Sequence, residues 1–213
     1  MKITATRYDL DPKTWTGGLQ VATGHDSEPR SPGLHVGGVL RDIENRAIKP
    51  GKREATSTLS NAERSRMGNY VEMGFIWEVL VEQVFRQRML SRRHAQAGVV
   101  SQQERQMGGM ALTPDGWCPL DDKVEEYKAT WTSMRRAEPP EGLFDAHNHW
   151  GWGKQNQCYC RAWDTRKGRF FVFWVNGDYR DSGPQIVKYD VEWTQAEIEE
   201  TWRMVTTHAA RMA

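Results

Sequence analysis

Two acidic residues and a lysine lie at spacings that suit metal-assisted hydrolysis of a phosphodiester. Asp115 stands between a proline and a glycine, and Glu126 and Lys128 follow in a predicted strand. Residues two apart on a strand share a face, so Glu126 and Lys128 point the same way. Carboxylates hold hard divalent cations, and a lysine beside them can orient or activate the attacking water. A hairpin after Asp115 would return the chain along itself, so we expect Asp115 and Glu126 to reach one metal ion.

Each of these residues taken alone has an ordinary structural explanation. Pro-Asp-Gly is a common turn, and charged side chains alternate on many edge strands. Their combination at this spacing is what favours a metal site.

Further polar residues upstream and downstream are candidates for the same site. Glu78 lies among apolar residues of a long predicted helix, where a glutamate either extends to solvent or faces a polar site. Glu82, one turn further on, is the competing candidate for that helix. Gln155 and Tyr159 lie four residues apart, on one helical face. They form either a surface pair or a pair that positions a phosphate or the metal-bound water.

The elements that must position these residues alternate between helical and strand patterns. Apolar periodicity predicts helices over 37–47, 69–94 and 145–158, and a capping box at 194–197 predicts the start of a C-terminal helix. Strands are expected over 99–105, 110–117, 123–131 and 186–193, with a hairpin formed by 161–163 and 169–175. We expect one α/β domain over 37–213, with a mixed central β-sheet flanked by α-helices. Residues 1–36 read as a polar N-terminal arm, extended or loosely ordered.

Four motifs, in order, resemble the PD-(D/E)xK nuclease superfamily, in its lambda exonuclease-like and RecB-like branch. They are Gly74-x-x-x-Glu78, Thr113-Pro114-Asp115-Gly116, Glu126-Tyr127-Lys128 and Gln155-x-x-x-Tyr159, and they span roughly residues 68–175. The resemblance implies a restriction-endonuclease-like core. It also implies Mg²⁺ or Mn²⁺ held by Glu78, Asp115, Glu126 and the backbone carbonyl of Tyr127. Lys128 would assist the nucleophilic water, and Gln155 and Tyr159 would support the site.

The function that this resemblance implies is that of a metal-dependent deoxyribonuclease. We expect an exonuclease acting on duplex ends in phage-type recombination or repair, with DNA as its substrate and a single-strand annealing protein as a family-level partner. A structure-specific or restriction-type endonuclease and a non-catalytic DNA-binding protein on the same scaffold are the alternatives. Polarity, strand preference and oligomeric state stay open, although lambda exonuclease relatives often form a ring.

The charge of the chain neither requires nor excludes a nucleic-acid partner. The net charge is +1, so any attraction for DNA must come from a local patch. Arg92 and Arg93 near the end of the long predicted helix, and Arg135 and Arg136 after the predicted catalytic strand, are the candidates. Basic residues at a helix end also suit the helix dipole, so a solvated helix end is an equal explanation.

Cysteine usage and hydropathy indicate a cytoplasmic protein, in the host cytoplasm if the chain is viral. Three cysteines indicate a reducing compartment without a disulfide framework, and they fall short of the four that hold an iron–sulfur cluster in some relatives. No signal peptide opens the chain, and no apolar run suits a membrane span. The His-x-His at 147–149 and the Cys-x-Cys at 158–160 lack the usual zinc-ligand spacing, so we do not expect zinc.

Overall fold

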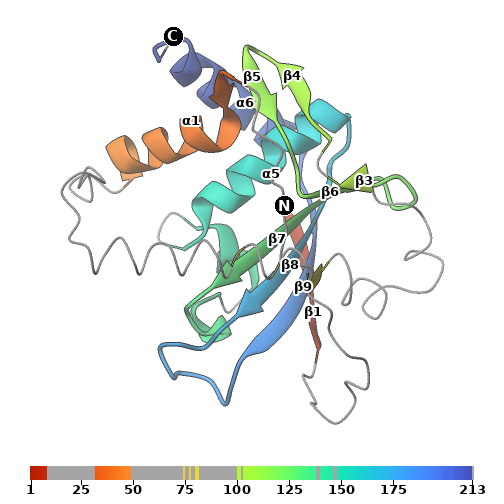
Figure 1. The fold of residues 1–213 in the computed structure, drawn as a ribbon, viewed down its shortest axis with the longest axis vertical. Helices are drawn as coiled ribbons and strands as arrows, with labels where there is room; N and C mark the ends of the chain where they lie inside the picture. Colours follow the sequence, from red (N-terminus) through yellow and green to blue (C-terminus); the bar gives the residue numbers. More distant parts are fainter. Residues whose placement is uncertain are drawn as a thin grey trace.

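A mixed β-sheet is the centre of the fold. The computed structural model describes residues 1–8, 32–48, 74, 77, 80–81, 100–101, 103–137, 140–145 and 148–212. Within these ranges six strands form one sheet in the order β1-β9-β8-β7-β6-β3 (Figure 1). They are β1 (Lys2–Tyr8), β3 (Val100–Ser101), β6 (Gly116–Cys118), β7 (Lys123–Thr130), β8 (Lys167–Trp174) and β9 (Gln185–Glu192). Strands β7 and β8 run parallel and the other neighbours run antiparallel. The predicted α/β class with a mixed central sheet is confirmed.

Three α-helices cover one face of this sheet (Figure 1). They are α1 (Val36–Ile43), which continues as the π-helix η2 (Glu44–Ile48), α5 (Trp150–Trp163) and α6 (Gln195–Ala209). Helix α6 begins with the predicted capping box, in which the Thr194 side chain accepts from the Glu197 N–H and the Glu197 carboxylate accepts from the Thr194 N–H. None of the helices in the described ranges is long and apolar enough to cross a membrane.

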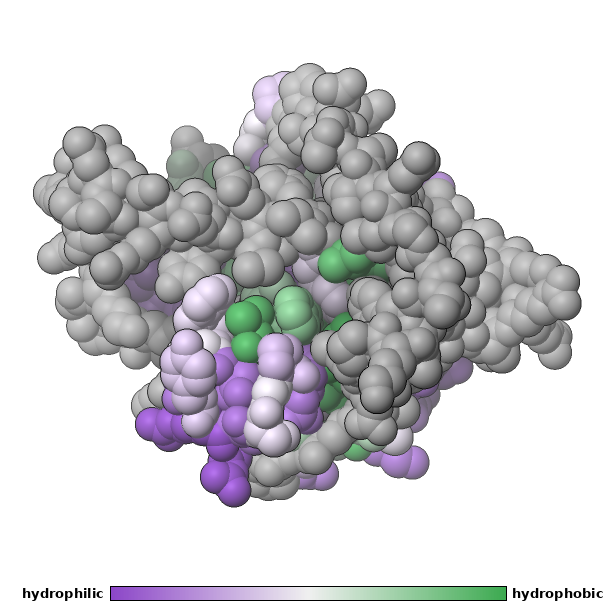
Figure 2. Space-filling model, turned by 60° about the horizontal axis from the view of Figure 1, so that its bottom comes forward, coloured by the Kyte–Doolittle hydropathy of each residue, from purple (hydrophilic) through white to green (hydrophobic). Residues whose placement is uncertain are grey.

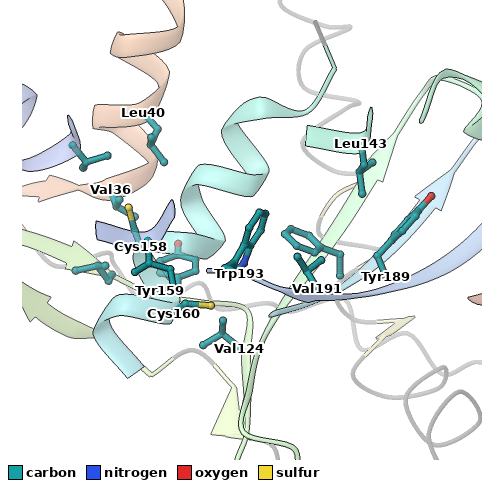
Figure 3. Close-up of a cluster of buried hydrophobic side chains, with 14 of the residues drawn as sticks. Val36, Leu40, Val124, Leu143, Cys158, Tyr159, Cys160, Tyr189, Val191 and Trp193 are labelled. Carbon is teal, nitrogen blue, oxygen red and sulfur yellow. The ribbon is translucent and has the colours of Figure 1, made fainter. Parts of the chain in front are cut away.

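The sheet is apolar on both faces, and the side chains of β7 are divided between them. Val124 belongs to the main core between the sheet and the three helices, part of which Figure 3 shows. Tyr127 belongs to a second cluster on the opposite face, together with Trp77, Phe171 and Ile186. Because side chains alternate on a strand, Glu126 shares the helix-covered face with Val124, and Glu125 shares the opposite face with Tyr127.

A second, three-stranded sheet packs beside the helices, in the order β2-β5-β4. Its strands are β2 (Leu34–His35), β4 (Arg105–Met107) and β5 (Met110–Leu112). Gly108 and Gly109 connect β4 to β5 with φ of +58° and +75°, values that favour glycine. A Cβ on Gly108 would approach the Trp202 ring to 2.8 Å, so this turn packs directly on α6.

Several sequence-based expectations differ from the structure. The segments 99–105 and 110–117, each expected as one strand, are each divided between the two sheets. Residues 161–163 are the last turn of α5 and not a hairpin strand, so the hairpin prediction is wrong; β8 instead pairs in parallel with β7. The segment was too short for its periodicity to separate strand from helix. Helix α5 begins at Trp150, not near residue 145, and it tolerates Gly153 because the Phe144 ring packs against it; a Cβ there would lie 2.9 Å from that ring.

The N-terminal segment is only partly described. Lys2–Tyr8 is extended, as expected, but it is an edge strand that pairs with β9 over its whole length. Residues 9–31 lie outside the described ranges, so the predicted domain boundary near residue 36 stays a prediction. Of the long helix expected over 69–94, residues 74, 77, 80 and 81 are described, the first three as α-helix and residue 81 as π-helix.

Candidate active site

The hairpin of β6 and β7 brings Asp115 beside Glu126. Gly116 pairs with Glu125, so the next residue back along β6, Asp115, lies opposite Glu126. Asp115 Oδ2 accepts a hydrogen bond of 2.7 Å from the backbone N–H of Tyr127. This bond fixes the carboxylate of the turn against the middle of β7.

Lys128 joins the two carboxylates. Its Nζ lies 2.5 Å from Glu126 Oε2 and 3.7 Å from Asp115 Oδ2. The Glu126 side chain is 1% exposed, whereas those of Lys128 and Asp115 are 18% and 20% exposed. A carboxylate buried to this degree is costly unless a cation compensates it. The three side chains therefore form one charged cluster that is buried at Glu126 and reaches solvent at Asp115 and Lys128.

Helix α5 adds a hydrogen-bonded pair on the same face of the sheet. Gln155 Nε2 donates to the Tyr159 hydroxyl at 2.8 Å. Burial raises the pKa of Tyr159 well above its ordinary value, and the nearby carboxylates of Glu126 and Asp115 raise that pKa further. Tyr159 is therefore a neutral phenol close to both acids. Because Tyr159 is buried, the pair is part of the interior and not a surface pair.

The polar residues between Gln155 and Tyr159 have structural partners of their own. Asn156 Oδ1 accepts from the Trp193 indole N–H at 2.8 Å and lies over Gly168, where a Cβ would approach that oxygen to 2.0 Å. Gln157 accepts a hydrogen bond from Thr201 of α6. Tyr159 of α5 thus lies near the charged cluster, and Cys160 on the neighbouring face is also close enough for Glu126 to raise its pKa.

Several predicted site residues lie outside the described ranges. These are Glu78, its competitor Glu82, and the arginines Arg92 and Arg93. Trp77, next to Glu78, is described: its indole donates to the Phe171 carbonyl at 3.0 Å, on the face of the sheet opposite Glu126. Within the described ranges no group of three or more His, Cys, Asp or Glu suits a metal ion. A third protein carboxylate for the cluster therefore stays a prediction.

The two other predicted arginines follow β7 in the short 3-10 helix η5 (Met134–Ala137). Arg135 is exposed, and its guanidinium donates to the Arg180 carbonyl at 3.5 Å. The Arg136 side chain is not among those described.

Sequence reasoning did not anticipate the charged network on the other face of β7. Arg169 of β8 pairs with Glu125 at 3.2 Å, Asp121 at 2.7 Å and Asp190 at 2.9 Å. Burial would lower the pKa of Arg169, but these three acids together raise it above its ordinary value. The pair Glu125-Glu126 could have predicted this network from the sequence. Because side chains alternate on a strand, the two glutamates lie on opposite faces, and each needs its own cationic partner.

Among the described residues, His149 and the three cysteines do not lie together as a group that could hold zinc. Cys118, Cys158 and Cys160 are free and buried, and burial raises the pKa of Cys158 to about 12. His149 stacks on the Trp152 ring at 3.7 Å, and His147 lies outside the described ranges. High thiol pKa values oppose the thiolate form that binds metals.

Comparison with solved structures gives distant likenesses, among them the two that follow. No protein-family model matches the chain, and no curated protein matches it significantly. A crystal structure of a phage related exonuclease from Haemophilus somnus 129PT is 13% identical, with a TM-score of 0.49, over 84% of this chain and 94% of that chain. The structure of SSO0001 is 15% identical, with a TM-score of 0.33, over 79% of this chain and 84% of that chain. Likenesses this distant do not establish a function, which has to be inferred from the residues.

Proposed function

We propose that this chain is a metal-dependent deoxyribonuclease of the PD-(D/E)xK type that hydrolyses phosphodiester bonds. One observation carries the proposal: Asp115, Glu126 and Lys128 meet in one partly buried cluster. Two carboxylates and an amine in one partly buried cluster are the groups that phosphodiester hydrolysis with a divalent cation requires.

The donor atoms of this cluster suit a hard divalent cation. Asp115 uses Oδ2 to accept from the Tyr127 N–H, and the Glu126 carboxylate adds a second pair of oxygens, of which Oε2 is paired with Lys128. Carboxylate and carbonyl oxygens favour Mg²⁺ or Mn²⁺ over thiolate-preferring metals. We propose Asp115, Glu126 and the Tyr127 carbonyl as protein ligands, with Glu78 or Glu82 as a further one. A bound ion would neutralise phosphate charge and make a bound water more acidic.

The remaining groups would position the substrate and the nucleophile. Lys128 is a fixed positive charge with three donors, placed where negative charge develops on the phosphate. Tyr159 accepts from Gln155, so its own hydroxyl hydrogen is directed to another acceptor. We assign that hydrogen to the attacking water or to a phosphate oxygen. As a phenol with a raised pKa, Tyr159 keeps this hydrogen across the working pH range.

Within this class we propose an exonuclease acting on duplex ends, in phage-type recombination or repair. DNA would approach past Arg135 and Arg136, together with Arg92 and Arg93, and a single-strand annealing protein is the proposed partner. A structure-specific endonuclease is the second candidate. Supercoiled circular DNA separates the two, because an enzyme that needs ends leaves it intact.

The test compares Mg²⁺-dependent degradation of linear duplex DNA by the wild type and by Lys128→Ala. We expect a loss of about a hundredfold to a thousandfold in rate, the range seen when one preorganised charge stabiliser is removed. Lys167→Ala, which removes an exposed lysine at the start of β8, is the matched control and should keep full activity. Equal rates in the wild type and Lys128→Ala would remove Lys128 from the mechanism. Calorimetric titration with Mn²⁺ completes the test, since binding that survives in Asp115→Ala would contradict the proposed ligand set.

A further inference from the structure

The loop between β8 and β9 exposes an aromatic ring that folding alone does not favour. Tyr179 is 89% exposed, the highest value among the described large hydrophobic residues. Its φ of +54° lies in the left-handed region, which bulky side chains rarely adopt. Such strain persists only where the surroundings impose it, and it occurs preferentially at functional sites.

Hydrogen bonds brace this loop from both sides. The Asn176 side chain accepts from the Asp181 N–H at 3.0 Å and donates to the Asp181 carbonyl at 2.9 Å. Asp178 Oδ1 accepts from the Ser133 N–H at 2.7 Å, which ties the loop to the segment after β7. Tyr179 is therefore held outward by a defined backbone.

A second exposed aromatic adjoins the same loop. Trp131 is 48% exposed, and its carbonyl accepts from the Gly177 N–H at 2.7 Å. A Cβ on Gly177 would lie 2.0 Å from Trp131 Nε1, so the glycine is what lets the indole lie against the loop. Trp131 and Tyr179 thus belong to two segments in direct contact.

The C-terminal end of β7 connects this surface to the charged cluster. Trp131 follows Lys128 by three residues, about 10 Å along an extended chain, which is roughly the rise of three stacked nucleotides. The exposed side chains of Arg135 and Arg180 lie at this loop, where Arg180 also pairs with Asp178 at 3.7 Å. Figure 2 brings this end of the molecule forward and shows hydrophilic side chains gathered beside a smaller group of hydrophobic ones.

We propose that Trp131 and Tyr179 form a stacking platform for the unpaired bases of a single DNA strand next to the active site. The ligand is an unpaired strand because paired bases are already stacked on their neighbours and offer few free faces. Stacking on aromatic rings tolerates any sequence, and the two arginines suit the phosphates between the bases. The inference rests on the proposed function, and it specifies the substrate as DNA with a single-stranded or frayed end.

The experiment measures binding without hydrolysis, by fluorescence anisotropy in EDTA with a labelled thymidine oligonucleotide and a labelled blunt duplex. Tyr179→Ala should weaken oligonucleotide binding about tenfold, in the range found for removal of one stacking ring, and change duplex binding by less than about twofold. Tyr179→Phe should bind as the wild type, because the ring and not the hydroxyl stacks. Leu120→Ala, which truncates an exposed apolar residue before the start of β7, is the matched control and should have no effect.

Three results would overturn the platform. They are unchanged oligonucleotide binding by Tyr179→Ala, equal losses in Tyr179→Ala and Tyr179→Phe, and equal weakening of oligonucleotide and duplex. A second measurement replaces thymine by 5-iodouracil and maps the photo-crosslink by mass spectrometry. Crosslinks at Tyr179 or Trp131 support stacking, and crosslinks confined to other residues contradict it.

The two proposals fail in different ways. If binding depends on Tyr179 but the wild type shows no Mg²⁺-dependent hydrolysis, the stacking platform is supported and the nuclease proposal is contradicted. Hydrolysis that depends on Lys128, with no effect of Tyr179→Ala on binding, would leave the nuclease and remove the platform.

Discussion

Two neighbouring glutamates on β7 are equally buried and have opposite surroundings. Glu125 is bound by Arg169 and by the Tyr127 hydroxyl, in a network where three acids (Asp121, Glu125, Asp190) meet three bases (Lys123, Arg169, Lys188). Glu126, on the other face, shares Lys128 with Asp115. Among the described residues one cluster is balanced, and the other has two carboxylates to one cation. Burial alone thus does not distinguish the structural acid Glu125 from the proposed metal ligand Glu126, and we base that distinction on the balance of charge around each.

The largest expected effect separates the two glutamates by activity. Glu126→Gln keeps the shape of the side chain and removes a charge that the proposed cation needs, so we expect DNA hydrolysis to fall about a thousandfold, roughly 4 kcal/mol on the barrier. The midpoint of thermal unfolding should change little, because Lys128 keeps its ion pair with Asp115. Steady-state cleavage with saturating Mg²⁺ measures the first quantity and calorimetry the second. Full activity of Glu126→Gln would contradict the proposed difference between a catalytic Glu126 and a structural Glu125.

The reciprocal substitution should act on stability. Glu125→Gln removes one charge from the network around Arg169, and breaking a buried pair from one side typically costs about 3 kcal/mol. The activity per folded molecule should stay within about twofold of the wild type, because the substitution is on the opposite face. Urea unfolding followed by cleavage assays on the folded fraction tests both statements. If Glu125→Gln lost activity but kept the stability of the wild type, the ion pairs around Arg169 would be part of the active site and the contrast would be wrong.

The smallest expected effect is a pH dependence of the balanced network. Burial would raise the pKa of Asp190, but Arg169 and Lys123 outweigh burial and lower that pKa to about 2. A depressed pKa means that the unfolded chain takes up the proton first, so Asp190 stabilises the fold above its unfolded pKa near 4. That contribution, on the order of 2 kcal/mol, is lost as the pH falls from about 4 to 2. Asp190→Asn should lack this part of the acid unfolding curve, and a curve identical to that of the wild type would contradict it.

Local patterns predicted the parts of the fold and of the cluster that depend on neighbours in sequence. The capping box at Thr194 follows from adjacent residues, as does the shared face of Glu126 and Lys128. The approach of Asp115 to Glu126 also followed, because a short hairpin leaves few alternatives. The metal-ligand roles and the third carboxylate at Glu78 stay predictions.

Features that depend on long-range pairing could not be predicted from one sequence. Arg169 lies 44 residues from Glu125, and no local pattern links them. The pairing of β1 with β9 joins opposite ends of the chain, and the parallel pairing of β7 with β8 requires knowing that α5 crosses between them. The exposure of Tyr179 was equally hidden, because the loop is fixed in part by a hydrogen bond that Asp178 accepts from the distant Ser133 N–H.

The network around Arg169 has a consequence for the opposite side of the sheet. Sliding β7 by a single position would exchange its two faces, presenting Glu125 to the helices and turning Glu126 toward the second apolar cluster. The slip that places Val124 opposite Arg169 would leave a buried guanidinium facing an apolar side chain, so Arg169 penalises that direction of slip. The ion-pair network thus disfavours a shift in the register of β7. Residues that do not contact the proposed catalytic acids therefore help to align them.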